Sequence, residues 1–139
     1  MNKTTNNQEF FVSYRIYYED TDAGGVVYYA NYLKFFERAR TEMLRTKSLN
    51  QSELKEQRNI IFMVRKCQIE YKIPARLDDL ITIKTKITSL SRISISMNQQ
   101  MIRNQDQKLL NETDVELVCV NSTSMKPCRI PKDLSDIPN

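Results

Sequence analysis

No histidine occurs among the 139 residues of this sequence. Its absence excludes Ser–His and Cys–His nucleophilic schemes and the common histidine-based catalytic zinc sites, so acid–base chemistry must use other side chains or backbone dipoles. With only two glycines and four prolines, the chain is neither low-complexity nor collagen-like. No run approaches the roughly 18 apolar residues of a membrane helix, and the polar N-terminus lacks the apolar region of a secretory signal. We therefore expect a cytoplasmic protein without a transmembrane segment.

Neither the spacing of the cysteines nor the distribution of charge indicates a metal centre or a nucleic-acid interface. The three cysteines, Cys67, Cys119 and Cys128, lack the close C-x-x-C spacing of a zinc site and cannot all pair within one chain. We expect free thiols. The 21 lysines and arginines are interspersed with 17 acidic residues, whereas nucleic-acid binding needs a basic stripe. The mild positive excess suits an anionic small ligand, and we expect no nucleic-acid partner.

The hydrophobic pattern predicts one strand followed by one long helix. Even positions from 12 to 18 carry β-branched or aromatic residues, and this period of two predicts a strand over residues 11–18. The strand ends at residues 19–25, a segment that contains both glycines. A helix is predicted from about Tyr28 to Thr46, because an apolar stripe repeats there at helical spacing. The stripe consists of Tyr32, Phe36, Ala39 and Met43.

The rest of the chain predicts four further strands joined by short turns. They span residues 61–73, 81–88, 93–101 and 115–120, after a polar connection at 50–59 that suits a short helix. In the first of these strands, one predicted apolar face holds Ile61, Met63, Cys67, Ile69, Tyr71 and Ile73. Short connections favour antiparallel pairing, so we expect a single α+β domain over residues 1–139. Residues 1–9 form a polar tail and residues 132–139 an irregular tail. Dimerisation that continues the sheet would cover an exposed edge strand.

The junction between the first strand and the helix is the candidate site. Asp22 lies just before Gly24 and Gly25, and a helix begins a few residues later. Glycines let the backbone pass close to a ligand, and a helix N-terminus offers unpaired N–H groups that stabilise an oxyanion beside a carboxylate able to activate water. The structural interpretation is that Asp22 is a turn or N-cap residue and the glycines only permit the turn. Spacing alone leaves both interpretations open.

The residues of this junction closely resemble those of a known enzyme family. Residues 17–32 and 36–44 resemble the acyl-CoA thioesterases associated with the Tol-Pal system, often called the YbgC family, a branch of the 4-hydroxybenzoyl-CoA thioesterase group. The resemblance continues through residues 65–66, 70–71, 74–79, 110–112, 125–127 and Pro131. It implies a hotdog fold, in which a curved antiparallel sheet wraps a long helix. It also implies dimers, often paired into tetramers, with active sites at the subunit interface and no metal or other cofactor.

The resemblance assigns roles to individual residues. The family's catalytic aspartate falls on Asp22, the preceding tyrosine on Tyr18, and a frequent histidine on Tyr29. A phenol has an ordinary pKa of about 10, so Tyr29 is a poor base at neutral pH but still donates a hydrogen bond. Backbone N–H groups near Val27, Tyr28 and Tyr29 would polarise the thioester carbonyl, and Asp22 would act as general base or as nucleophile. Tyr18 would position Asp22 or the water.

Substrate contacts and alternative functions stay open. Gly24 and Gly25 are expected to border the substrate, and Tyr32 either lines the acyl pocket or packs in the core. Arg92 and Lys126 either meet the CoA phosphates or are solvated turn residues. One alternative function is a thioesterase that acts on acyl-carrier-protein. The other is a non-catalytic hotdog scaffold that binds acyl-CoA or a partner, which the tyrosine at the usual histidine position favours, whereas the intact aspartate and glycines favour catalysis.

Overall fold

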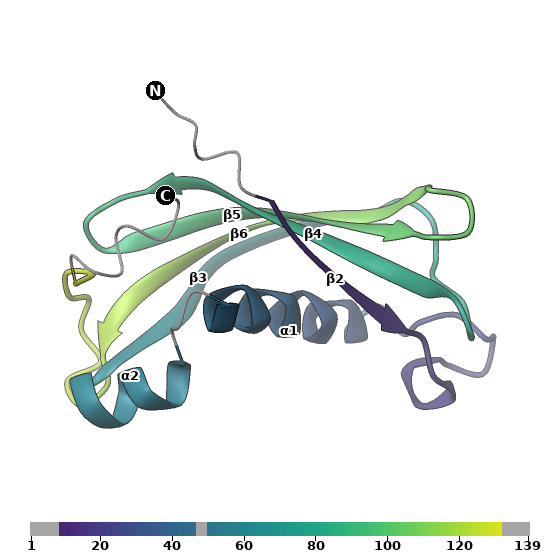
Figure 1. The fold of residues 1–139 in the computed structure, drawn as a ribbon. Coiled ribbons are helices and arrows are strands. Elements are labelled where there is room, and N and C mark those ends of the chain that lie inside the picture. The colour runs from purple at the N-terminus through teal and green to yellow at the C-terminus, as the bar shows by residue number, and fades with distance from the viewer. Residues whose placement is uncertain (1–8, 47–49, 132–139) are drawn as a thin grey trace.

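The computed structural model describes residues 9–46 and 50–131, and it has the predicted hotdog architecture. Its elements are β2 (Glu9–Arg15), the 3-10 turn η1 (Tyr18–Asp20), α1 (Asn31–Thr46), α2 (Gln51–Arg58), β3 (Ile60–Tyr71), β4 (Leu80–Leu90), β5 (Ser94–Arg103) and β6 (Leu109–Asn121). The strands form one antiparallel sheet in the order β2-β4-β5-β6-β3, which curves around α1 (Figure 1). Among these residues no helix has both the length and the apolar character needed to cross a membrane.

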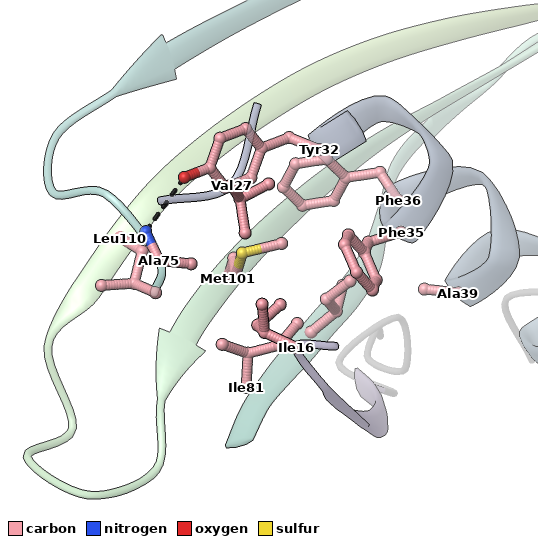
Figure 2. Packing of buried hydrophobic residues seen from close by; sticks show 11 residues of the cluster. Ile16, Val27, Tyr32, Phe35, Phe36, Ala39, Ala75, Ile81, Met101 and Leu110 are labelled. Atoms are coloured by element: carbon pink, nitrogen blue, oxygen red, sulfur yellow. Dashed lines mark hydrogen bonds between the residues drawn. The ribbon is translucent and has the colours of Figure 1, made fainter. Parts of the chain in front are cut away.

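The long helix buries the predicted apolar stripe against the concave face of the sheet. Tyr32, Phe36 and Ala39 are each at most 3% exposed. Near the N-terminal end of α1 they pack in one cluster with sheet residues such as Ile81 and Met101 (Figure 2). In a second cluster, Met43 packs against residues at the opposite end of the sheet. Since both clusters use only one face of α1, the 3.6-residue period read from the sequence is confirmed.

A polar side chain in the middle of this core ties the helix to the sheet. Gln99 on β5 is completely buried. Its amide nitrogen donates to the backbone carbonyl of Phe36 at 2.9 Å and to the hydroxyl of Thr85 at 3.0 Å. Its amide oxygen accepts a hydrogen bond of 3.0 Å from the Arg40 guanidinium. Because a buried amide is costly unless its hydrogen bonds are made, this network fixes α1 at one position along the sheet.

One prediction for strand β3 is wrong. The register between β3 and β6 shifts between Val64 and Lys66, which makes Arg65 an extra, bulged residue. A bulge reverses which side chains point to a given face. Phe62 therefore shares the concave face with Cys67, while Ile61 and Met63, predicted on that face, lie on the other. Ile73 lies beyond the end of the strand.

Several boundaries also differ from the prediction. The first strand ends at Arg15, so Tyr18 lies in η1, and α1 begins at Asn31 because residues 28–30 still belong to the preceding turn. Strand β6 begins at Leu109, where the polar sequence concealed it, and the short helix in 50–59 is confirmed as α2. Glu9, predicted in the tail, starts β2, and residues 1–8 and 132–139 lie outside the described residues.

Candidate active site

Asp22 lies in a tight hairpin that joins η1 to the start of α1. Thr21 and Val27 form an antiparallel bridge, and the Asp22 N–H donates to the Val26 carbonyl at 2.9 Å. The Oδ1 atom of Asp22 accepts a hydrogen bond of 2.8 Å from the Gly24 N–H. Gly25 has a φ of 79°, a conformation that favours glycine. Asp22 thus has the turn role of the structural interpretation, while its Oδ2 atom has no hydrogen bond among the described residues.

The hairpin is held against the segment that follows β3. The Val27 N–H donates to the Ala75 carbonyl at 2.9 Å, and the Leu77 N–H donates to the Gly25 carbonyl at 3.2 Å. The Ala75 N–H in turn donates to the Tyr32 hydroxyl at 3.0 Å, the dashed line in Figure 2. Tyr32 is 3% exposed, and its phenol bridges α1 to this segment. Hydrogen bonds therefore join the start of the helix and the two loops.

The backbone donors expected near the helix N-terminus are not equally available. The Val27 N–H is used by Ala75, and the Tyr28 N–H donates to the Asp20 carbonyl at 3.3 Å. The Tyr29 N–H has no acceptor within residues 9–46 and 50–131. Asn31, the first residue of α1, donates its N–H to the Tyr28 carbonyl at 2.8 Å. Of the three backbone groups named from the sequence, only that of Tyr29 is open to a ligand.

A cleft of about 220 Å³ opens at Tyr29. It is lined by Val27, Tyr29, Tyr32, Tyr71, Lys72, Ile73 and Pro74. The rings of Tyr32 and Tyr71 lie 5.5 Å apart, and the Tyr71 hydroxyl donates to the Tyr29 carbonyl at 3.2 Å. Burial raises the pKa of both phenols, so they stay protonated at neutral pH. Tyr32 thus serves the core and the cleft together.

Tyr71 lines this cleft, although the sequence analysis did not single it out. The sequence predicts it only as an apolar position of a strand, because the alternating pattern is the same for a residue that lines a cleft and for a residue in the core. The hydrogen bond to Tyr29 joins residues 42 positions apart in the chain. Only the antiparallel pairing that brings the end of β3 to the start of α1 reveals the contact.

Two predicted tyrosines are exposed in the single chain. The Tyr18 side chain is 82% exposed, and its hydroxyl has no hydrogen bond among the described residues. Tyr29 is 63% exposed, with its ring 4.8 Å from that of Tyr28. A side-chain hydrogen bond with Tyr29 raises the pKa of Tyr28. The chain by itself therefore gives Tyr18 no contact that fixes it on Asp22.

Arg92, in the turn between β4 and β5, and Lys126, in the segment after β6, follow strand ends that lie opposite to the end of β2, the strand that leads into the Asp22 hairpin (Figure 1). The Ile130 N–H donates to the Arg92 carbonyl at 2.7 Å, and the Asn121 N–H donates to the Lys126 carbonyl at 2.9 Å, so both cations border the end of β6. Both side chains are exposed. Within one chain they are not brought to the Asp22 hairpin, and a shared site requires a second copy.

Comparisons with known proteins agree with the fold and with the family resemblance. The thioesterase-like superfamily matches residues 17–137. The acyl-CoA thioester hydrolase YbgC of Escherichia coli is 51% identical over 120 residues, which cover 86% of this chain and 88% of that protein. The acyl-CoA thioesterase YbgC of Haemophilus influenzae is 44% identical, with 86% and 87% covered. The crystal structure of a probable thioesterase from Bartonella henselae superposes with a TM-score of 0.84 at 36% identity, covering 89% of this chain and all of that one. The chain is a thioesterase and belongs to the YbgC family within the thioesterase-like superfamily.

Proposed function

We propose that this protein hydrolyses acyl-CoA thioesters, with Asp22 as the catalytic carboxylate and the Tyr29 N–H as the oxyanion donor. The observation that carries the proposal is that Tyr29, whose N–H has no acceptor among the described residues, lines a tyrosine-rich cleft at the start of α1. A thioester carbonyl bound at this N–H would direct its acyl group into the cleft. The positive end of the α1 dipole stabilises the charge that develops on the carbonyl oxygen.

The chemistry is consistent with the absence of histidine. In one route Asp22 takes a proton from water, which attacks the carbonyl; in the other the carboxylate attacks directly and water hydrolyses the mixed anhydride. In both routes the bond to sulfur breaks and a thiolate leaves. An alkyl thiol has an ordinary pKa of about 8.5, so the thiolate is a good leaving group and needs no strong general acid. The reaction as proposed uses no metal or other cofactor.

We further propose that two copies pair through β3. Among the described residues this strand is hydrogen-bonded to β6 on one side only, yet it leaves Met63 41%, Val64 51% and Tyr71 47% exposed. Pairing of an apolar edge with its own copy extends the sheet and removes the open edge. Twofold antiparallel pairing sets the Ile60 end of one β3 beside the Tyr71 end of the other, and therefore beside the partner's cleft.

This pairing would unite the separated halves of the predicted site. The Ser122 N–H donates to the Asn59 carbonyl at 2.8 Å, which ties the loop of Lys126 to the start of β3. In the dimer that loop, together with Arg92 at the same end of the sheet, would approach the cleft of the other subunit. Lysine and arginine there suit the phosphates of CoA. A tetramer would be two such dimers.

The test is thiol release from acyl-CoAs ranging from acetyl to palmitoyl, and from benzoyl-CoA, with wild type and Asp22→Asn. Asparagine keeps an oxygen for the Gly24 N–H bond, so the hairpin should survive while kcat/KM falls by about 10²–10⁴-fold. Asp78→Asn is the matched control, because Asp78 is exposed in the adjacent loop at a φ of 72° that asparagine tolerates. A loss below tenfold in Asp22→Asn refutes the assignment.

Two further outcomes discriminate the alternatives. Turnover of acyl-carrier-protein but not of acyl-CoA would identify a carrier-protein thioesterase. Saturable binding of acyl-CoA without turnover of either donor would identify a binding scaffold. The dimer is tested separately by light scattering of Val64→Lys, which should yield monomers and lose activity, with Phe11→Lys on the opposite edge strand β2 as control. Phe11 is 56% exposed, and a dimer that survives Val64→Lys contradicts pairing through β3.

A further inference from the structure

The end of the sheet that lies away from Asp22 holds two cysteines whose thiols are in contact. Cys119 on β6 is completely buried, and Cys128 is half-buried in the segment that follows. Their Sγ atoms are 3.6 Å apart. The third cysteine, Cys67, lies on β3 and is exposed. The pair takes no part in the proposed thioesterase chemistry.

The backbone holds the two cysteines in a geometry that a disulfide requires. Val120 and Pro127 form an antiparallel bridge, so Cys119 and Cys128 are the next opposed pair, and the Cys128 N–H donates to the Cys119 carbonyl at 2.9 Å. Opposed residues of antiparallel segments have Cα atoms about 4.5–5.5 Å apart. Disulfides form across Cα separations of about 4.4–6.8 Å.

We propose that Cys119 and Cys128 are a redox modification site, which a low-molecular-weight disulfide converts to an intramolecular disulfide. The Cys128 thiolate attacks one sulfur of the reagent, forming a mixed disulfide and releasing one thiol. The Cys119 thiol then loses its proton and attacks the Cys128 sulfur, which expels the second thiol. Two electrons pass from the pair to the reagent, and the two protons end on the released thiols. The two Sγ atoms must approach by about 1.5 Å to reach a bond of about 2.05 Å.

The order of the two attacks follows from the surroundings of each sulfur. Burial raises the pKa of the Cys119 thiol to about 12, so this cysteine is protonated and shielded when a reagent arrives. Cys128 lies outside the strands and is partly accessible. Once Cys128 carries a leaving group, the Cys119 sulfur is the nearest nucleophile, because the two Sγ atoms already lie 3.6 Å apart. Cys67 on β3 pairs instead with Val115, four residues before Cys119 on β6.

The bond would close a ten-residue ring from Cys119 to Cys128. A short ring of this kind still removes conformational freedom from the unfolded chain. The oxidised protein should therefore melt roughly 5–10 °C above the reduced protein. Cys128→Ser should show no such difference between oxidising and reducing conditions.

The experiment incubates the full-length protein with oxidised glutathione, denatures it, alkylates free thiols and maps the peptides. A tryptic peptide spanning residues 109–129 carries both cysteines, because trypsin does not cut between Lys126 and Pro127, and cleavage after Met125 separates them. The expected result is two fragments held together only by a disulfide, with Cys67 alkylated or glutathionylated. In Cys128→Ser the same fragments must separate, and Cys67→Ser must behave as wild type. Recovery of Cys119 and Cys128 as alkylated or separately glutathionylated thiols overturns the proposal, whatever becomes of Cys67.

Discussion

Replacement of Gln99 by methionine removes the polar link between α1 and the sheet while it keeps most of the side-chain volume. The substitution eliminates the donor to the Phe36 carbonyl, the donor to the Thr85 hydroxyl and the acceptor of the Arg40 guanidinium. Thr85 is completely buried, so its hydroxyl has no water to replace the lost partner. Methionine fills the space without strain because it is unbranched and flexible.

The three lost hydrogen bonds set the size of the effect. Two are between neutral groups, and each such bond contributes about 1 kcal/mol net. The third involves the charged Arg40, but this side chain is only partly buried, so solvent recovers part of its energy and about 1 kcal/mol is again appropriate. The sum is about 3 kcal/mol, a large share of the 5–15 kcal/mol by which domains of this size are stable.

Urea unfolding followed by circular dichroism measures this difference, with protein concentration held fixed because a dimer gains apparent stability by mass action. The matched control is Gln100→Met. Gln100 is the next residue on β5, faces the other side of the sheet, and donates one 3.2 Å hydrogen bond to Glu112. It should lose less than about 1 kcal/mol. If Gln99→Met loses no more than Gln100→Met, the network does not hold the helix and the reasoning is refuted.

Three further predictions concern the cleft, the outer face of the sheet and the proposed contact of Lys126 with CoA. Tyr71→Phe keeps the ring but loses the 3.2 Å bond to the Tyr29 carbonyl; kcat should fall about 3–10-fold with little change in KM, and steady-state kinetics that show no loss contradict it. A hydrogen bond from Asn98 lowers the pKa of Glu112. The Glu112 carboxylate therefore stabilises the fold at neutral pH, and this stabilisation is lost as the pH falls below about 4.5. Glu112→Gln should therefore flatten the acid limb of the stability curve, and an unchanged limb would exclude this role. Lys126→Ala should raise KM for acyl-CoA several-fold at constant kcat, whereas an unchanged KM removes Lys126 from the substrate site.

Most of the fold follows from the periodicity of the sequence, since an element that buries one face carries apolar residues at a regular spacing. The apolar stripe of α1 and the alternation of β4 around Ile81 and Ile83 are patterns of this kind. The bulge at Arg65 produces no such pattern, because the extra residue changes which side chains of β3 face the core without changing the composition of the strand. The start of β6 was missed for a different reason. Asn111 and Thr113 face the core as polar residues, so the apolar alternation that marks a strand begins only at Val115.

The candidate site was only partly predictable, because its geometry depends on long-range contacts. The hairpin around Asp22 and the glycines could be recognised locally, from residue types alone. The distinction between the Val27 and Tyr29 N–H groups could not, since it depends on the carbonyl of Ala75 on a distant loop. Likewise, the separation of Lys126 from Asp22 becomes apparent only from the strand pairing, in which β2 and β6 finish at opposite ends of the sheet.

The tyrosine at position 29 is compatible with catalysis because the proposed contribution of this residue comes from its backbone. Its N–H group has no acceptor among the described residues, and this does not depend on the side chain at position 29. The Tyr71 hydroxyl fixes the orientation of residue 29 by a hydrogen bond to its carbonyl. The side chain itself is 63% exposed, so a change from histidine to tyrosine disturbs no buried packing. A thiolate leaving group also removes the need for a proton donor that histidine would supply. Tyr29→His should therefore change the pH dependence of turnover more than its maximum rate, whereas a large rise in kcat would mean that proton transfer, and not the oxyanion contact, limits this enzyme.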